Sequence, residues 1–239
     1  MGGYDYISGN IENVRNEIRS ACKEFGRSPD DITLVAVSKT FPVEAITSAN
    51  KSGQLDFGEN KVQELAAKHG SFAKEDIRWH LVGKLQTNKV KYVVPFVHLI
   101  HSVDSLKLAE EIQSRAFKEE RIIDCLIQVN TSDEEQKAGC EVNEALNLSK
   151  QISIFENVKV RGLMTMAKYI DDYNDSEHIK IVRANFRTLK MLFDELKSFN
   201  EGIKFLSMGM TQDLKIAVEE GSNMLRVGTA IFGKRKREE

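Results

Sequence analysis

The chain has 239 residues, 41% of them hydrophobic and 29% charged, a composition typical of a globular protein with a large core. Lys and Arg number 34 and Asp and Glu 36, so the formal net charge is −2. This near balance excludes a dominant basic surface of the kind that binds nucleic acid or an anionic membrane. No apolar run approaches the length that spans a bilayer, so no membrane association is expected.

The cysteines and the first residues indicate the compartment. Cys22, Cys125 and Cys140 are odd in number and far apart, which predicts neither a disulfide framework nor a metal-binding pair. The first ten residues, MGGYDYISGN, lack the basic and apolar regions of a secretion signal. We expect a cytoplasmic protein. No linker rich in Gly, Ser or Pro divides the chain, so we also expect one domain over 1–239, with its barrel at about 32–233.

The first predicted element is an amphipathic helix, Ile7–Phe25, with Ile11, Val14, Ile18 and Ala21 on one face. From about residue 32, short runs rich in Val, Ile and Leu alternate with longer segments, of which Ser105–Lys118 and Glu177–Phe199 have the clearest helical spacing. The runs predict eight strands: Ile32–Lys39, Leu55–Gly58, Ile77–Gly83, His98–Val103, Ile123–Asn130, Val158–Met166, Lys204–Gly209 and Met224–Ile231. No helix is predicted after the last strand.

This alternation predicts an α/β fold in which helices cover a parallel sheet. Eight strands in a chain of this length favour closure into a single (β/α)8 TIM barrel over an open, doubly wound sheet. The helix Ile7–Phe25 would cover the gap between strands eight and one and complete the outer ring of helices.

In such barrels the functional groups lie at the carboxyl ends of the strands. Lys39 is the last residue of the first predicted strand and shares the side of Val35 and Val37, which are expected to face inward. Partial desolvation there would lower the pKa of the lysine and free its amine to attack a carbonyl. A lysine that simply extends from the strand end into solvent is the alternative.

The ends of strands seven and eight predict an anion site. LSMGMTQD places Ser207 and Gly209 at a tight turn, before a helix that begins near Asp213 and that Thr211 could cap. LRVGTAIFG places Arg226, Gly228 and Thr229 at the barrel mouth. The loops after strands seven and eight form the recurrent phosphate site of barrel enzymes. A phosphate cradle opposite a reactive lysine suits either pyridoxal phosphate or a sugar phosphate in a lysine-dependent aldolase.

Six motifs in order span nearly the whole chain: LVAVSKT (34–40), DFGENKVQE (56–64), WHLVGKLQTNK (79–89), VRGLMTM (160–166), LSMGMTQD (206–213) and RVGTAIFG (226–233). With them the chain resembles the small pyridoxal phosphate homeostasis proteins (the YggS/PROSC family), which have the alanine racemase N-terminal-domain fold. The resemblance implies pyridoxal 5′-phosphate (PLP) as the cofactor, held as a Schiff base on Lys39.

The resemblance also implies roles for the other candidate residues. Arg226 would face the pyridine nitrogen of the cofactor, and Asn60 and His80 would line the ring or its edge. Met164 and Met166 would line the ring or pack the barrel. The phosphate would be held by Ser207, Gly228 and Thr229, with the backbone near Met208 and Gly209.

The family resemblance implies storage, delivery or buffering of PLP rather than robust catalysis. A racemase needs two bases, and the larger racemases of this fold take one from a second domain. Lys39 could supply one base, and Tyr92, Tyr169 and Tyr173 lie in predicted loops and helices rather than at strand ends. A weak amino-acid racemase stays as the alternative. Which PLP-dependent apoenzymes receive the cofactor, and whether the protein is a monomer or a dimer, stays open.

No metal site is predicted. His98 and His101 form an H-x-x-H sequence, but residues three apart on a strand point to opposite faces. No H-E-x-x-H motif or cysteine cluster accompanies them.

Overall fold

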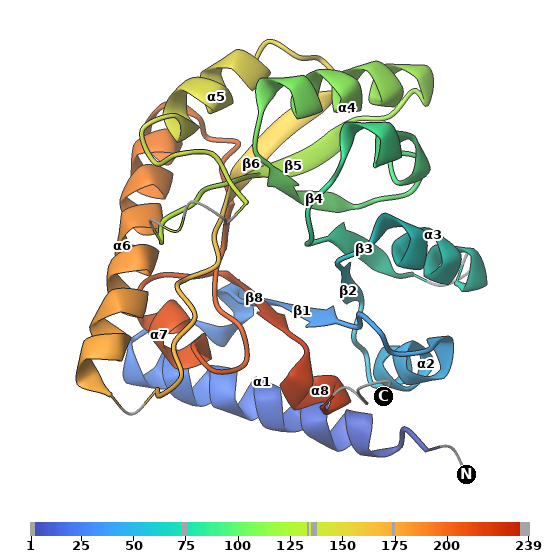
Figure 1. The fold of residues 1–239 in the computed structure, drawn as a ribbon. Helices are drawn as coiled ribbons and strands as arrows, with labels where there is room; N and C mark the ends of the chain where they lie inside the picture. Colours follow the sequence, from blue (N-terminus) through green and yellow to red (C-terminus); the bar gives the residue numbers. More distant parts are fainter. Residues whose placement is uncertain (1–2, 73–75, 133, 135–137, 174, 235–239) are drawn as a thin grey trace.

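A computed structural model describes the chain except residues 1–2, 73–75, 133, 135–137, 174 and 235–239. Eight parallel strands form a closed barrel in which β8 pairs with β1 (Figure 1). The strands are β1 (Thr33–Val37), β2 (Asp56–Glu59), β3 (Arg78–Leu81), β4 (Leu99–Val103), β5 (Ile123–Gln128), β6 (Val158–Met164), β7 (Phe205–Ser207) and β8 (Met224–Val227). The predicted (β/α)8 barrel is confirmed.

Helices surround this ring of strands (Figure 1). They are α1 (Tyr6–Glu24), α2 (Val43–Lys51), α3 (Val62–Ser71), α4 (Leu106–Lys118), α5 (Ala145–Ile152), α6 (Ser176–Phe199), α7 (Leu214–Glu219) and α8 (Thr229–Phe232), with 3-10 turns η1 (Pro29–Asp31) and η2 (Thr87–Tyr92). None of the helices in the described ranges combines the length and the apolarity that crossing a membrane requires.

The N-terminal helix α1 closes the outer layer at the seam between β8 and β1 (Figure 1). Its buried stripe of Ile7, Ile11, Val14 and Ile18 faces the barrel, as the spacing predicts. At its start, Tyr6 Oη donates a hydrogen bond to the carbonyl of Phe232 at 2.8 Å. These contacts join α1 to α8. Because α8 is short, α1 covers the part of the outer layer that a longer helix after β8 would fill.

Several strands end earlier than predicted. β1 stops at Val37, two residues before Lys39, and β8 stops at Val227. The expectation that no helix follows β8 was wrong, because the chain turns at Gly228 into the short helix α8. The amide of Phe232 donates to the carbonyl of Gly228 at 2.9 Å, which closes this turn. The apolar residues Ile231 and Phe232 therefore pack in the outer layer rather than extend the strand.

The apolar core has two parts. A large one lies between the strands and the helices, and the only tryptophan, Trp79, is buried there beside Phe57 and Phe72. A small one fills the barrel interior and contains Val35, Leu99, Leu126, Met164 and Met224. The interior cluster is small because other inward positions carry polar side chains, which build the site.

Close packing of β6 against β7 requires a glycine at 162. The register of β5 and β6 shifts by one residue there, and Gly162 has a φ of +156°. A Cβ at this position would lie 1.8 Å from the carbonyl oxygen of Phe205. We predict that Gly162→Ala lowers the free energy of unfolding by about 2 kcal/mol or more, measured by urea denaturation.

Gly9 is the matched control for that substitution. It lies exposed in α1, and no atom lies within 4 Å of the position of an added Cβ. Gly9→Ala should raise the free energy of unfolding by about 0.5–1 kcal/mol, because alanine loses less backbone entropy in a helix. Equal effects of the two substitutions would contradict the close contact inferred at Gly162.

Candidate functional site

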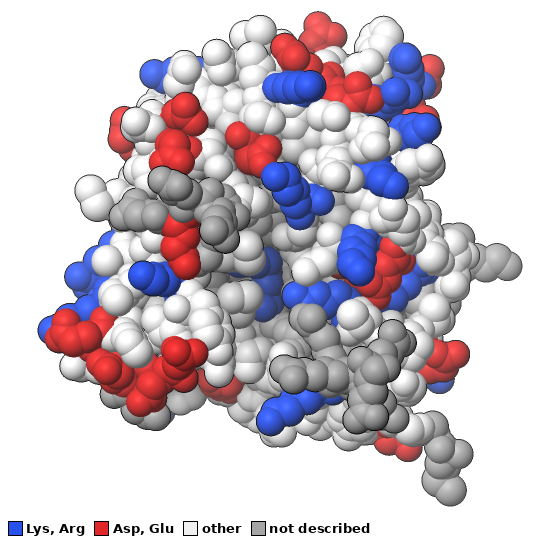
Figure 2. All heavy atoms as spheres, in the orientation of Figure 1, with Lys and Arg blue, Asp and Glu red and all other residues white. Residues whose placement is uncertain are grey.

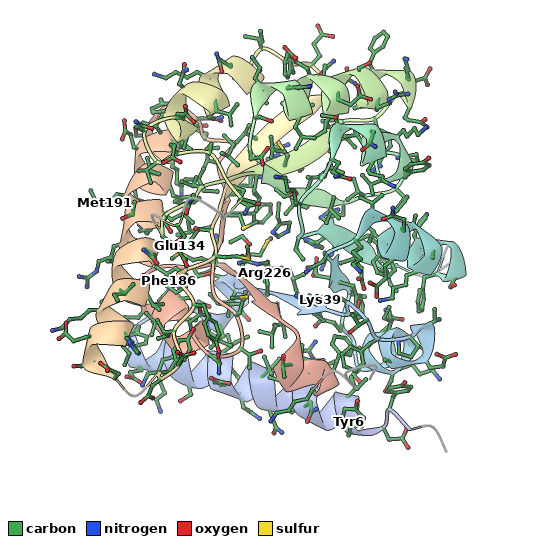
Figure 3. All side chains as sticks on the ribbon, viewed as in Figure 1. Tyr6, Lys39, Glu134, Phe186, Met191 and Arg226 are labelled. Carbon is green, nitrogen blue, oxygen red and sulfur yellow. The ribbon has the colours of Figure 1, made fainter. Side chains whose placement is uncertain are left out.

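Pairing of β1 with β8 brings the two halves of the predicted site together. Val35 pairs with Arg226, and a Cβ on Gly228 would lie 3.1 Å from the carbonyl oxygen of Val37. The segment of Lys39 therefore leaves the barrel beside the segment of Gly228. Figure 3 shows Lys39 and Arg226 within the ring of strands. The space-filling view of the same side has a hollow over this ring, with basic side chains near it and acidic ones gathered at the lower left edge (Figure 2).

A partly buried ion-pair network holds the backbone on both sides of Lys39. We call Ser38, Thr40, Glu59, Glu64 and Lys68 the lysine clamp. Before Lys39, the ammonium of Lys68 donates to the carbonyl of Ser38 at 2.9 Å. After it, the amide of Thr40 donates to Glu64 Oε1 at 2.6 Å, and Thr40 has a φ of 69°, unusual for a β-branched residue. The clamp fixes the half-buried Lys39 in place through its neighbours.

Lys68 is the centre of this clamp. Its side chain is 7% exposed and forms ion pairs with Glu59 at 2.6 Å and with Glu64 at 2.7 Å. Glu59 is fully buried and also accepts from the hydroxyl of Ser38 at 2.6 Å. Burial raises the pKa of Glu59 above its ordinary value, and Lys68 and Ser38 oppose that rise. Glu59 thus depends on Lys68 to stay ionised.

Arg226 lies in the barrel interior, and no carboxylate among the described residues forms a direct ion pair with its guanidinium. It is 4% exposed, and its guanidinium donates to Ser207 Oγ at 2.7 Å and to the carbonyl of Thr165 at 2.8 Å. Burial lowers its pKa to about 10, against the opposing charge of Asp213, so it stays protonated at neutral pH. A buried, unpaired guanidinium is costly unless a ligand accepts from it. The lone pair of a pyridine nitrogen is such an acceptor.

Ser207 lies deeper than the phosphate assignment implies. Its side chain is fully buried, and its hydroxyl contacts Arg226 and also His101 Nδ1, at 3.1 Å. The resemblance assigns this hydroxyl to the phosphate of the cofactor, whereas the structure places it in a polar network inside the barrel.

The loops after β7 and β8 adopt the tight turns that their glycines allow. Gly209 has a φ of +98°, and a Cβ there would lie 2.4 Å from the Cβ of Ala217, so this glycine lets α7 pack close to the strand ends. Asp213, not Thr211, is the N-cap residue of α7, and Asp213 Oδ1 accepts from the amide of Met210 at 2.5 Å. Gly228 precedes α8, whose first residue, Thr229, is exposed.

The other candidate residues divide between the mouth and the interior. Asn60 follows β2 and is half-buried, and the backbone of Asn60 lies so close to Gly83 that a Cβ on Gly83 would clash with it. Met164 belongs to the interior cluster, and Met166 lies beyond the end of β6 and is exposed. His80 is 1% exposed, and both its ring nitrogens have partners inside the barrel.

His98 and His101 do not separate to opposite faces as predicted. The rings of both lie beside His80, with centroids 5.5 and 5.2 Å away. The reason is that His98 precedes β4 and so lies outside its alternation. His101 is buried and His98 exposed. Within the described residues no group of three or more His, Cys, Asp or Glu side chains is arranged to hold a metal ion.

Comparison with known proteins identifies the family of this chain. The family model described as "Alanine racemase, N-terminal domain" matches residues 10–236. The pyridoxal phosphate homeostasis protein of Aquifex aeolicus is 42% identical over 227 residues, which cover 95% of this chain and 97% of that one. The chain belongs to the family of pyridoxal phosphate homeostasis proteins. Its identity to the homeostasis protein of Escherichia coli is 37%, over 96% of this chain and 97% of that one.

Solved structures extend the family assignment to the fold. PipY of Synechococcus elongatus, whose structure has PLP bound, is 33% identical, with a TM-score of 0.79 over 95% of this chain and 100% of PipY. An alanine racemase of Clostridium difficile has a TM-score of 0.77 at 15% identity, which shows a shared fold alone. The aligned region covers 98% of this chain but only 58% of the racemase, so the racemase has additional structure.

Proposed function

We propose that this protein binds pyridoxal 5′-phosphate at the barrel mouth and acts in cytoplasmic homeostasis of that cofactor by storing, delivering or buffering it. The observation that carries the proposal is the pairing of β1 with β8, which brings the clamped Lys39 segment next to Arg226 and Gly228. The PLP bound in PipY and the names of the curated relatives support the same cofactor.

Each candidate residue has a role in this proposal. Lys39 would hold the cofactor through its amine, which can condense with an aldehyde with loss of water. Arg226 would donate a hydrogen bond to the pyridine nitrogen. The turns at Gly209, Gly228 and Thr229 hold the phosphate, while Asn60 and Met164 border the ring. His80 and Ser207, which lie deeper, act on the cofactor through Arg226.

Arg226 also bears on catalysis. A guanidinium that stays protonated at neutral pH donates to the ring nitrogen but does not transfer a proton to it. The ring then withdraws electrons less strongly, which disfavours reactions through a carbanion. The site therefore suits reversible capture of the cofactor better than rapid turnover of amino acids.

The tyrosines give no support to the alternative function, a weak racemase. A second base from tyrosine would require a phenolate at neutral pH. Burial raises the pKa of Tyr173 to about 12, helped by the charge of Asp213 and by Tyr169, and so opposes that ionisation. Tyr92 is 50% exposed and Tyr169 is 72% exposed. One domain that holds the cofactor and passes it to PLP-dependent apoenzymes is the arrangement we favour.

Reduction with borohydride tests the proposal. PLP added to the purified protein should produce a visible absorption band, which borohydride erases as it converts the imine to a stable amine. Peptide mass spectrometry should then find the pyridoxyl group on Lys39. A protein that captures a sugar phosphate under reduction and forms no PLP adduct would be an aldolase-like protein, and the proposal would be wrong.

A further inference from the structure

Five polar side chains form a continuous hydrogen-bonded path across the barrel interior, which we call the interior relay: Asp56, His80, His101, Ser207 and Arg226. Asp56 Oδ1 lies 2.9 Å from His80 Nε2, and His80 Nδ1 lies 2.9 Å from His101 Nε2. His101 Nδ1 lies 3.1 Å from the hydroxyl of Ser207, which is 2.7 Å from Arg226. All five residues are buried, with at most 7% exposure.

The relay runs from one end of the barrel towards the other. Asp56 and Arg78 are the first residues of β2 and β3, whereas Ser207 is the last residue of β7. Arg78 donates to Asp56 Oδ2 at 2.6 Å, and its side chain is 46% exposed. The relay therefore begins at a partly solvated ion pair and ends at the buried guanidinium that faces the cofactor in the proposed function.

The chemistry of its two ends gives the relay a direction. A carboxylate only accepts hydrogen bonds, so His80 donates from Nε2 to Asp56, and with this single ring proton it accepts at Nδ1. His101 then donates from Nε2 to His80 and accepts at Nδ1 from the hydroxyl of Ser207. A guanidinium only donates, which leaves the oxygen of Ser207 to accept from Arg226. With one proton on each ring, every donor along the relay meets an acceptor only when both histidines carry that proton on Nε2.

The electrostatics agree with this arrangement. Burial lowers the pKa of His101 far below its ordinary value, helped by the charges of His80 and Arg226, so its ring is neutral. Burial alone would raise the pKa of Asp56, but His80 and Arg78 hold it below its ordinary value, so its carboxylate is ionised. The charge of Asp56 is thus connected to the guanidinium of Arg226 through the two histidine rings and the hydroxyl of Ser207, which polarise one another.

We propose that Asp56, His80 and His101 are positioning residues that act through Ser207 to orient Arg226 and to set the electrostatic environment of the cofactor's pyridine nitrogen. This inference rests on the proposed function. The inference explains why His80 and Ser207 lie deep in the barrel, because they influence the cofactor through Arg226 without touching the cofactor. A purely structural network would affect stability without affecting the spectrum of the bound cofactor.

The tautomers of the histidines test the relay in the cofactor-free protein. Nitrogen NMR of protein labelled with ¹⁵N-histidine should show His80 and His101 protonated on Nε2 and unprotonated on Nδ1. The two rings are assigned by the signals that disappear in His80→Asn and His101→Asn. A neutral ring with its proton on Nδ1 at either position would overturn the relay, and this measurement on the unaltered protein needs no variant that folds stably.

Variants with bound PLP test the coupling to Arg226. His101→Asn keeps an acceptor near the hydroxyl of Ser207 but is too short to reach His80, and Asp56→Asn keeps an acceptor but loses the charge. Each should shift the absorption maximum of the bound cofactor and weaken its binding about tenfold, the effect of disrupting one hydrogen bond to a charged group. His98→Gln is the control, since this exposed neighbour of His80 lies outside the relay and should change neither quantity.

A double variant distinguishes a relay from independent contacts. If the path acts as a unit, Asp56→Asn and His101→Asn together should weaken binding about tenfold, as each does alone, whereas independent effects would multiply to about a hundredfold. Multiplying effects, or an absorption maximum unchanged in both single variants, would overturn the inference. Failure of the unaltered protein to bind PLP would instead overturn the proposed function, which the histidine tautomers do not test.

Discussion

Replacing Lys39 with alanine should abolish the borohydride-stable pyridoxyl adduct completely. The clamp holds the backbone of Ser38 and Thr40 through groups that do not include the side chain of Lys39. The rest of the site should therefore stay folded and still bind PLP weakly through Arg226 and the phosphate loops. The measurement is the intact mass of the protein after addition of PLP and reduction, together with thermal unfolding of the cofactor-free variant.

Lys107→Ala is the control for this experiment. Lys107 is an exposed lysine of α4, on the outside of the barrel, and its removal should leave the adduct unchanged. A specific adduct that persists at full yield in Lys39→Ala and moves to another lysine would show that the barrel mouth is not built around Lys39. Adducts on several lysines that persist in both variants would indicate that reduction traps surface lysines without selectivity.

Lys68→Met should be the most destabilising of the single substitutions considered. It removes the cation that pairs with the fully buried carboxylate of Glu59, and Glu59 Oε2 already has no hydrogen-bond partner among the described residues. Breaking a buried pair from one side costs about 3–5 kcal/mol, because the remaining charge stays buried without compensation. Urea denaturation gives this difference, and the release of Ser38 should also lower the yield of the Lys39 adduct.

Two further variants test whether the buried charge is the cause. Adding Glu59→Gln to Lys68→Met should restore much of the lost stability, since the uncompensated carboxylate is gone. Lys180→Met is the matched surface control. Lys180 pairs with Glu177 on α6, both largely exposed, so that substitution should cost less than about 1 kcal/mol. A double variant no more stable than Lys68→Met would point to lost packing rather than to the charge.

The stability of Lys68→Met should depend on pH in a direction that the clamp determines. Burial raises the pKa of Glu59 in the folded protein, and Lys68 normally opposes this rise, so the pKa rises further without it. The folded variant then takes up a proton at a higher pH than the unfolded chain does, and acidification stabilises it. The difference in free energy of unfolding between the variant and the unaltered protein should narrow as the pH falls from about 7 to about 5. A difference that widens over this range would contradict the assignment.

The sequence predicted the barrel because its signals are local. Short apolar runs and amphipathic segments follow one another from residue 32, and the stripe of Ile11, Val14 and Ile18 marks the closing helix. Strand ends were less predictable. Ile231 and Phe232 are apolar enough to continue β8, yet Gly228 starts α8 and turns them into the outer layer. Only tertiary packing decides between these two conformations.

The clamp and the interior relay were not predicted, because both depend on distances between strands. Glu59 and Lys68 are nine positions apart, and only the pair of Glu64 with Lys68 has helical spacing. A signal for the relay was nevertheless present. Strands buried on both faces are normally apolar, yet His80 and His101 occur inside such strands. Polar residues at these positions are a useful indication of an interior network.

The closure of β1 against β8 has a consequence for synthesis of the protein. Lys39 is translated well before Arg226 and Gly228. A nascent chain on the ribosome has the amine but not the groups that orient and hold the cofactor beside it. We expect cofactor loading to follow synthesis of β8 and the turn after it, and fragments that stop before β8 should expose two open sheet edges and bind without selectivity.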